Sequence, residues 1–434
     1  MLASILIIAV FLVFAVLMIT KKISALLAMP FMAFFIALIS GLFSGMPFFK
    51  GGKDSLMEFL FTTVIADGSA RLATAIMYTV FGSILSQAVQ KTGIAEKLVK
   101  TSAELAGDKK LVIALVLTVA STIVFGSITG LGGFIMVASL VLPVMMAAGL
   151  SPLLSSCLIL FSLSIGGIFN PANWGFYKDA LGVEIAVIKN LSVSYAVILS
   201  IVCIAFIIIE YLREKKRIAW AVNITDEPKI KISPFALLTP LLPIILIVNP
   251  FYSVPVVPAF IIASIYGISF MGFKKIIPTF TASIIDGIKD IAPVIGLFIG
   301  IGMLLNSVMA PCTSTIMKPL LTAIVPSGKT AYILFFFILA PLALYRGPFN
   351  LYGLGSGLAA LLIGSSILSP PAVMAAFLSV GQIQGICDPT NTHNVWLSQY
   401  MKVSTGDMLT KTLPYVWCFV LFALLSAVFL GGVL

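Results

Sequence analysis

Two short polar segments interrupt apolar stretches of this sequence, and they are nearly the same segment twice. Residues 167–173 read GIFNPAN and residues 385–391 read GICDPTN, so that residue n of the first half matches residue n + 218 of the second. Asn or Asp followed by Pro favours a helix break, because Pro lacks an N–H group and restricts the residue before it. The broken ends expose N–H groups that attract anions and C=O groups that bind cations such as Na⁺.

The second segment differs from the first by an ionisable group, since Asp388 stands where the first copy has Asn170. A carboxylate at membrane depth is costly without a partner and is therefore a candidate for function. We predict that Asp388 carries a coupling proton or completes a Na⁺ site, with Thr392 and His393 as further cation-coupling candidates. The alternatives are a helix N-cap for Asp388 and a hydrogen-bonded structural role for His393.

Arg346 is the only charged residue between Lys329 and Asp388, and it lies in the Gly-Pro-containing segment 345–350. A guanidinium group can bind a carboxylate through two parallel hydrogen bonds, so we predict that Arg346 holds the anionic group of a substrate. The alternatives are an ion pair with Asp388 or a surface arginine. The other predicted substrate-binding residues are polar and lie at or beside the helix breaks: Ser127, Thr129, Asn170, Asn173, Asn350, Thr390 and Asn391.

Residues for enzyme or metal chemistry are scarce. The five cysteines are scattered without CxxC spacing, and the sequence has a single histidine. This pattern argues against a zinc site or a disulfide framework. No combination of nucleophile and base is evident, so we predict no catalytic residue, no enzyme activity and no cofactor beyond a coupling cation, H⁺ or Na⁺.

The composition indicates what kind of protein must position these residues. Of the 434 residues, 60% are hydrophobic and 10% are charged, and the mean hydropathy is +1.16. Soluble domains carry about 25% charged residues, so the chain is expected to be an all-α polytopic membrane protein. The net charge of +10 comes from basic residues in short loops, as the positive-inside rule describes. We therefore predict a multi-pass protein of the inner (plasma) membrane, surrounded by lipid, that binds no nucleic acid.

Hydrophobic runs and breaks place the elements of the first half. We predict spans over 2–20, 23–45, 71–90 and 190–211, with 46–67 as an interfacial arm. Residues 111–177 contain no Asp, Glu, Lys, Arg or His. Gly and Pro interrupt this stretch, which predicts a re-entrant hairpin over 111–148 with its tip near 127–130, then a helix over 152–177 broken near 170–173.

The same order of elements returns in the second half. Spans are predicted over 234–249, 254–273, 288–308 and 413–434, with Lys274-Lys275 in a loop. A hairpin is predicted over 330–368, with residues 345–350 as its tip, and a broken helix over 370–400. The predicted units are a first repeat at 1–212 (scaffold spans 1–90, hairpin and broken helix 111–189), a cytoplasmic linker at 213–233 and a second repeat at 234–434 (scaffold spans 234–308, hairpin and broken helix 330–402).

The distribution of basic residues predicts that the two repeats are inverted relative to each other. Lys21-Lys22, the lysines of 91–110 and the basic group of 213–217 fall on one side if the spans alternate. The first hairpin then enters from the cytoplasm and the second from outside. Corresponding broken helices in two inverted halves indicate a transport site near the bilayer midplane.

This layout resembles the ion transporter superfamily of secondary carriers, most closely the gluconate:proton symporters, with citrate symporters and divalent-anion/Na⁺ symporters more distant. The similarity is carried by the hairpin 125–143 with 148–152, the break 170–173 and the segment 381–396 leading to Tyr400. It implies substrate and cation sites formed by the hairpin tips and broken helices. It also implies a fixed scaffold with a moving transport domain, in an elevator-type homodimer.

The tips here read Ser127-Ile128-Thr129 and Asn350-Leu351-Tyr352, not the Ser-Asn-Thr pattern of the better-described relatives, which leaves H⁺ and Na⁺ coupling both open. The function predicted from the sequence is cation-coupled symport of a small organic anion, such as a sugar acid or hydroxy-carboxylate. The alternative is a Na⁺/H⁺ antiporter in which Asp388 exchanges the ions and no organic substrate is needed. A channel or a non-transporting receptor is a third possibility.

Overall fold

The computed structural model describes residues 2–20, 22–49, 55–107, 109–213, 232–249, 252–325 and 328–434. Within these residues the fold is helical throughout, and nine helices are long and apolar enough to cross a membrane. The prediction of an all-α polytopic membrane protein is confirmed. The predicted cytoplasmic linker falls largely on residues 214–231, which lie outside the described part of the chain.

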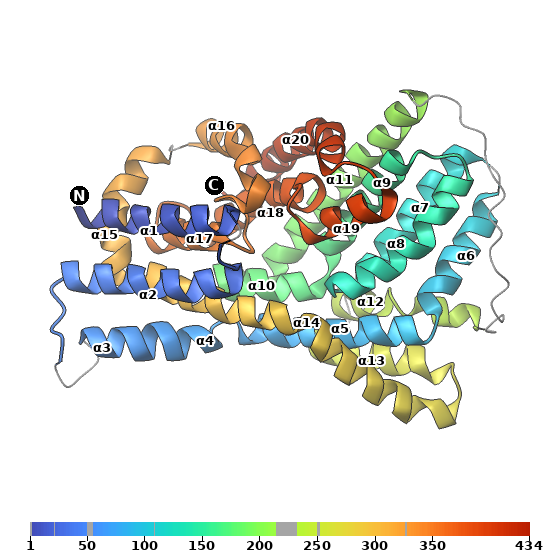
Figure 1. The fold of residues 1–434 in the computed structure, drawn as a ribbon, viewed down its shortest axis with the longest axis horizontal. Helices are drawn as coiled ribbons and strands as arrows, with labels where there is room; N and C mark the ends of the chain where they lie inside the picture. Colours follow the sequence, from blue (N-terminus) through green and yellow to red (C-terminus); the bar gives the residue numbers. More distant parts are fainter. Residues whose placement is uncertain are drawn as a thin grey trace.

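In chain order, the first half contains two separate helices, a long helical run, a hairpin and a broken helix (Figure 1). Its elements are α1 (Leu2–Ile19), α2 (Ala25–Phe43), α3 (Leu56–Glu58), the π-helix η1 (Phe59–Asp67), α4 (Gly68–Ala70), α5 (Ala73–Lys91), α6 (Ile94–Ala106), α7 (Lys110–Phe125), α8 (Gly130–Ala147), α9 (Pro152–Phe169), α10 (Pro171–Leu181) and α11 (Ile185–Arg213). The hairpin α7–α8 and the break between α9 and α10 lie where the sequence predicts them.

The second half repeats this order of elements. It contains η2 (Pro234–Leu238), α12 (Leu242–Val248), α13 (Val256–Ser269), α14 (Phe273–Met309), α15 (Pro311–Ile324), α16 (Lys329–Leu339), η3 (Ala340–Arg346), α17 (Leu354–Gly364), α18 (Pro370–Cys387), α19 (Thr392–Met401) and α20 (Thr405–Phe429). The second hairpin is formed by α16, η3 and α17, and the second broken helix by α18 and α19.

Two predictions about the scaffold were wrong. Residues 56–67, assigned to an interfacial arm, belong to a helical run of 36 residues from Leu56 to Lys91. Its π-helical part buries Phe59, Leu60 and Val64, so one face of it packs against the rest of the protein. The predicted span 288–308 begins much earlier, at Phe273, and Lys274-Lys275 therefore lies in the first turn of a helix and not in a loop.

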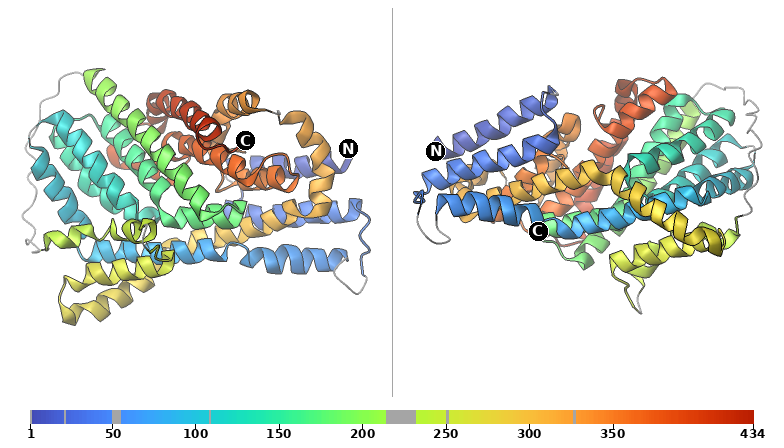
Figure 2. Two further views of the ribbon diagram at one scale, coloured as in Figure 1. Left: turned by 180° about the vertical axis from the view of Figure 1, so that it is seen from behind. Right: turned by 60° about the horizontal axis from the view of Figure 1, so that its bottom comes forward.

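The long helix α14 packs against α2 toward one end of the molecule and against α5 toward the other (Figures 1 and 2). Glycines allow the closest approach between α14 and the run that contains α5. A Cβ atom on Gly68 would lie 2.7 Å from Met303 Cα, and one on Gly287 would lie 3.0 Å from the Ile84 amide nitrogen. Small residues let helix backbones touch within a membrane, so these helices form a tightly joined scaffold.

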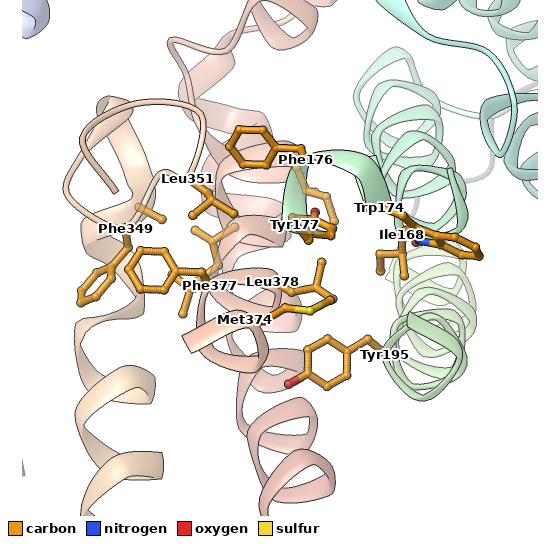
Figure 3. Packing of buried hydrophobic residues seen from close by; sticks show 14 of the residues in the cluster. Ile168, Trp174, Phe176, Tyr177, Tyr195, Phe349, Leu351, Met374, Phe377 and Leu378 are labelled. Carbon is orange, nitrogen blue, oxygen red and sulfur yellow. The ribbon is translucent and has the colours of Figure 1, made fainter. Parts of the chain in front are cut away.

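Aromatic side chains join the first broken helix to the second hairpin. Phe176 of α10 stacks on Tyr352, with 4.7 Å between ring centroids, and on Phe298 of α14, at 5.1 Å. Figure 3 shows Phe176 and Tyr177 beside Leu351, with Met374, Phe377 and Leu378 close by. Buried aromatic contacts of this kind contribute both area and geometry, and here they connect elements from opposite halves of the chain.

Candidate functional site

The first break is organised by Asn170, whose side chain is 3% exposed. Its Oδ1 atom accepts a hydrogen bond from the Ala172 N–H at 3.0 Å and so caps α10. Its Nδ2 group donates to the backbone carbonyls of Phe125 at 3.3 Å and Ile128 at 3.2 Å, at the tip of the first hairpin. Asn170 therefore lies between α9 and α10, and its side chain both caps α10 and holds the hairpin tip against the break.

The second break is organised by Asp388, which is fully buried. Its Oδ1 atom accepts hydrogen bonds from the backbone N–H of Thr390 at 2.8 Å and from the Thr390 hydroxyl at 2.7 Å. Its Oδ2 atom accepts from the backbone N–H of Arg346, at the tip of the second hairpin, at 3.2 Å. These bonds hold the turn between the two helices, and the N-cap position of α19 is Asn391 and not Asp388, so the predicted N-cap role is wrong. The Oδ2 bond connects Asp388 to its own hairpin.

The tip of the second hairpin has an unusual backbone. Tyr345 and Arg346 adopt left-handed conformations, with φ values of 55° and 58°, which are uncommon for residues other than glycine. The guanidinium group of Arg346 is exposed and has no hydrogen-bond or ion-pair partner within the described residues, so its contact with Asp388 is through the main chain only. Asn350 is buried, and its Oδ1 atom accepts from the Tyr352 N–H at 3.0 Å.

Each break also touches the hairpin of the other half. The hydroxyl of Tyr352, from the second hairpin, donates to Oδ1 of Asn173 at 3.0 Å. In return, the ring of His393 lies edge-on to Phe134 of α8, with 4.7 Å between centroids. Asn391 donates to the Gly385 carbonyl at 3.3 Å, and its Oδ1 atom lies 3.3 Å from Nδ1 of His393. Each break thus contacts the hairpin of the other half, through a hydrogen bond at Asn173 and through a ring contact at His393.

The remaining predicted site residues are placed differently. The buried Ser127 hydroxyl donates to the carbonyl of Pro240, between η2 and α12, and so fixes the first tip to the scaffold. Thr129 occupies the N-cap position of α8, and its Oγ1 atom is buried without a hydrogen-bond partner in the described part of the chain. Thr392 is exposed at the start of α19, away from the bonds that Asp388 makes.

Sequence reasoning missed Tyr352 and Arg71. Arg71 lies between α4 and α5, where its guanidinium donates to Asn306 Oδ1 at 2.7 Å and approaches the Met309 sulfur at 3.2 Å. Asn306 in turn donates to the carbonyl of Thr63 in the π-helix at 2.8 Å. The available signal was a charged residue inside an apolar run, which marks a candidate even when its partners are unknown.

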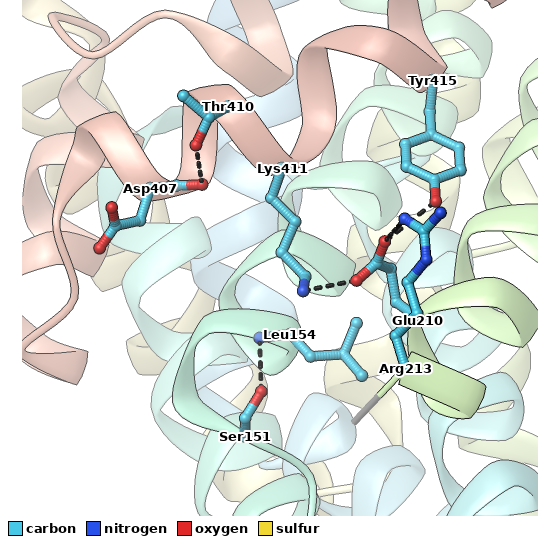
Figure 4. Close-up of polar contacts among 8 residues, drawn as sticks. All are labelled: Ser151, Leu154, Glu210, Arg213, Asp407, Thr410, Lys411 and Tyr415. Atoms are coloured by element: carbon cyan, nitrogen blue, oxygen red, sulfur yellow. Dashed lines mark hydrogen bonds and ion pairs between the residues drawn. The ribbon is translucent and has the colours of Figure 1, made fainter. Parts of the chain in front are cut away.

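A second polar cluster lies outside the breaks, where α11 and α20 meet (Figure 4). Glu210 is buried and accepts from Arg213 at 3.1 Å and Tyr415 at 3.0 Å, and it pairs with Lys411 at 2.5 Å. These residues border a cavity of about 640 Å³. Because the carboxylate is fully provided with donors, this cluster explains how the ends of two matched helices are held together. No group of three or more His, Cys, Asp or Glu residues in the described ranges is arranged to hold a metal ion.

Comparison with known proteins finds solved structures with a similar fold. No family model matches the sequence, and no curated protein is significantly similar to it. The YdaH transporter of Alcanivorax borkumensis is similar in structure, with a TM-score of 0.57 and 15% identity over 87% of this chain and 89% of that one. MtrF of Neisseria gonorrhoeae, described with a class of antimetabolite efflux pumps, has a TM-score of 0.56 and 14% identity over 93% and 94%. At these identities the similarity establishes a shared fold, and it does not single out the gluconate or citrate symporters.

Proposed function

We propose that this protein is a secondary active transporter that couples the symport of a small organic anion, such as a sugar acid or a hydroxy-carboxylate, to H⁺ or Na⁺. The fold is shared with two transporters, and the helix breaks supply the kind of site that carriers use. We further propose that it works as a homodimer in the inner (plasma) membrane, with an elevator-type motion of the hairpins and broken helices against the scaffold.

The observation that carries this proposal is the double connection of each break. Asn170 and Asp388 hold the hairpin tip of their own half, and Asn173 and His393 contact the hairpin of the other half. A ligand that binds at one break therefore changes the support of both tips. Coupling between two ligands requires such a shared two-state element, in which each ligand favours the same arrangement.

The proposed anion site uses the positive groups that remain available. The Arg346 guanidinium is exposed and without a partner in the described residues, and the helix starts at Pro171 and Thr392 present their positive dipole ends. Arg346 would hold the carboxylate, and Ser127, Thr129, Asn170, Asn173, Asn350, Thr390 and Asn391 would supply neutral polar contacts. Asp388, Thr392 and His393 remain the proposed cation-coupling residues at the second break.

The buried carboxylate of Asp388 also fits the second candidate, a Na⁺/H⁺ antiporter. The two functions differ in one measurable respect. An antiporter dissipates a pH gradient across proteoliposomes when Na⁺ alone is added, whereas a symporter does so only when its organic anion is present.

The test is uptake of radiolabelled gluconate and citrate into proteoliposomes under imposed H⁺ or Na⁺ gradients. We expect saturable, gradient-dependent uptake of a carboxylate. Arg346→Gln should weaken its apparent affinity about tenfold or more, since a hydrogen bond to a charged group contributes about 1.5–3 kcal/mol. Arg346→Lys, which keeps the charge but not the paired donors, should fall between. Absence of uptake for every carboxylate tested, with Na⁺-driven loss of the pH gradient, would replace this proposal by the antiporter.

A further inference from the structure

A carboxylate of the scaffold lies directly against the tip of the first hairpin. A Cβ atom on Gly130 would be 2.3 Å from Oδ2 of Asp290, and one on Gly132 would be 3.2 Å from Oδ1. Gly130 and Gly132 lie in the first turn of α8, so the carboxylate faces the start of this helix. Asp290 belongs to α14, and the two glycines leave it the room to touch the start of α8.

This carboxylate is incompletely bonded. Its Oδ2 atom is buried without a hydrogen-bond partner in the described residues, and so is the Oγ1 atom of Thr129, the residue just before Gly130. The two buried carboxylates described above are different, because Asp388 has donors on both oxygens and Glu210 has three charged or hydroxyl partners. A buried oxygen left without a partner costs about 1–3 kcal/mol, and more when it is charged.

No counter-ion compensates Asp290 in the described chain. Lys289, the neighbour of Asp290 in sequence, pairs with Asp286 at 3.7 Å, and Lys91 of α5 pairs with the same carboxylate at 2.7 Å. The helices α2, α4, α8 and α17, which pack on α14, carry no titratable side chain. Titratable side chains do occur on the other segments around α14 and on α14 itself. They are Asp67, Arg71, Tyr78, Lys91, Tyr266, Lys274, Lys275, Asp286, Lys289, Cys312 and Lys318.

We propose that Asp290 and Thr129 form a binding site for the coupling cation, a proton or a sodium ion, between the scaffold and the first hairpin. A proton taken up by Oδ2 would neutralise the carboxylate and create an O–H donor that the Thr129 hydroxyl can accept once the two oxygens approach, since neither atom has a partner in the described residues now. A sodium ion would be bound by the same two oxygens. Either cation completes the bonding that both buried atoms lack.

A cation bound at this site would control the movement of the first hairpin. This part of the inference rests on the proposed transport function. If the hairpin moves along α14, an ionised Asp290 loses its contact with the first turn of α8 and is left as a buried, uncompensated charge. Bound H⁺ or Na⁺ removes that charge and so permits the movement. The cation would therefore act at the sliding contact, in addition to any role at Asp388.

The first test measures cation binding without transport. The thermal unfolding midpoint of the purified protein in detergent is followed against NaCl, with choline chloride at equal ionic strength, and against pH without Na⁺. We expect a cation-dependent rise in the wild type that is lost in Asp290→Asn and weakened in Thr129→Val. Asp286→Asn is the matched control, because it removes an exposed carboxylate one turn away, and it should respond as the wild type does.

The outcomes separate this inference from the proposed function. A response to Na⁺ identifies sodium, and a response to pH alone identifies a proton. The inference is overturned if the wild type responds to neither, or if Asp290→Asn responds as the wild type does. Should Asp290→Asn not fold, Thr129→Val decides in its place, because it only removes one hydroxyl. In proteoliposomes, Asp290→Asn should lose gradient-driven accumulation of substrate and keep exchange of substrate across the membrane. If the proposed transport function is wrong, the wild type itself shows no uptake, so the two failures are distinguishable.

Discussion

At each helix break one side chain is hydrogen-bonded to the hairpin tip of its own half, but the direction of that hydrogen bond differs between the two breaks. At the first break, Asn170 donates to the carbonyl of Ile128. At the second, Asp388 accepts from the N–H of Arg346, the residue that matches Ile128 in the repeat. The left-handed backbone at Tyr345 and Arg346 accompanies this change, so that one tip offers an acceptor to its break and the other offers a donor.

The comparison explains why a carboxylate stands at only one break. An amide both accepts and donates, which the first break requires, whereas a carboxylate only accepts. Every hydrogen-bond partner of the Asp388 carboxylate within the described residues is a donor. Its charge therefore has a structural explanation alongside the proposed cation role, and substitutions that exchange the two side chains test that explanation.

The largest effect is expected from Asn170→Asp. The new carboxylate would face the carbonyl oxygens of Phe125 and Ile128, now at 3.3 and 3.2 Å from the amide nitrogen, in a buried position with no cation. A buried, uncompensated charge costs about 3–5 kcal/mol. The thermal unfolding midpoint of the variant should therefore fall well below that of Asn170→Ala, which leaves the carbonyls unpaired without repelling them. Equal midpoints for the two variants would contradict the assignment.

A smaller loss is expected from Asp388→Asn. The amide oxygen can still accept from Thr390, but the amide nitrogen cannot accept from the Arg346 N–H, which is left unpaired at a cost of about 1–3 kcal/mol. Faster amide hydrogen exchange at residues 345–350, measured by mass spectrometry, should report the loosened tip. In the double variant with Asn170→Asp the two losses should add, and mutual rescue would show that the breaks interact through their charge.

The smallest effect is expected from Thr390→Ala, which gives the second break the alanine that the first has at Ala172. Asp388 loses the hydroxyl donor at 2.7 Å and keeps the backbone N–H at 2.8 Å. The loss should be about 1.5 kcal/mol, the low end for a hydrogen bond to a charged group, because the carboxylate keeps its backbone donors. It should be seen as a small fall in the unfolding midpoint with unchanged exchange at the second tip. Increased exchange at that tip would mean that the Thr390 hydroxyl, and not the carboxylate alone, holds the hairpin.

The positions of the breaks and hairpins could be predicted from the sequence because Pro171 and Pro389 remove helical hydrogen bonds in any environment. The groups that face these breaks could not. The positive φ values of Tyr345 and Arg346 are not marked by glycine or asparagine, so nothing in the residue types shows that this tip presents an N–H. The cation-coupling role predicted for Asp388 from its charge therefore takes no account of the hydrogen-bond donors that surround the carboxylate.

The long scaffold helices were missed for a different reason. Charged residues such as Lys274 and Lys289 suggest the end of a span when one assumes that helices cross the membrane once and stop. Here the helix continues through them. Asp290 consequently fell at a predicted span end, where its contact with Gly130 and Gly132 depends on a packing between halves that sequence spacing does not reveal.

The length of these scaffold helices has a consequence for the surrounding lipid. The run from Leu56 to Lys91 has 36 residues and α14 has 37, so each extends about 50–55 Å, against about 30 Å for the hydrocarbon core. Being joined at Gly68 and Gly287, they must incline together, and thicker or thinner bilayers will change their common tilt. The length of the lipid acyl chains therefore affects the tilt of α14, the helix that the first hairpin contacts.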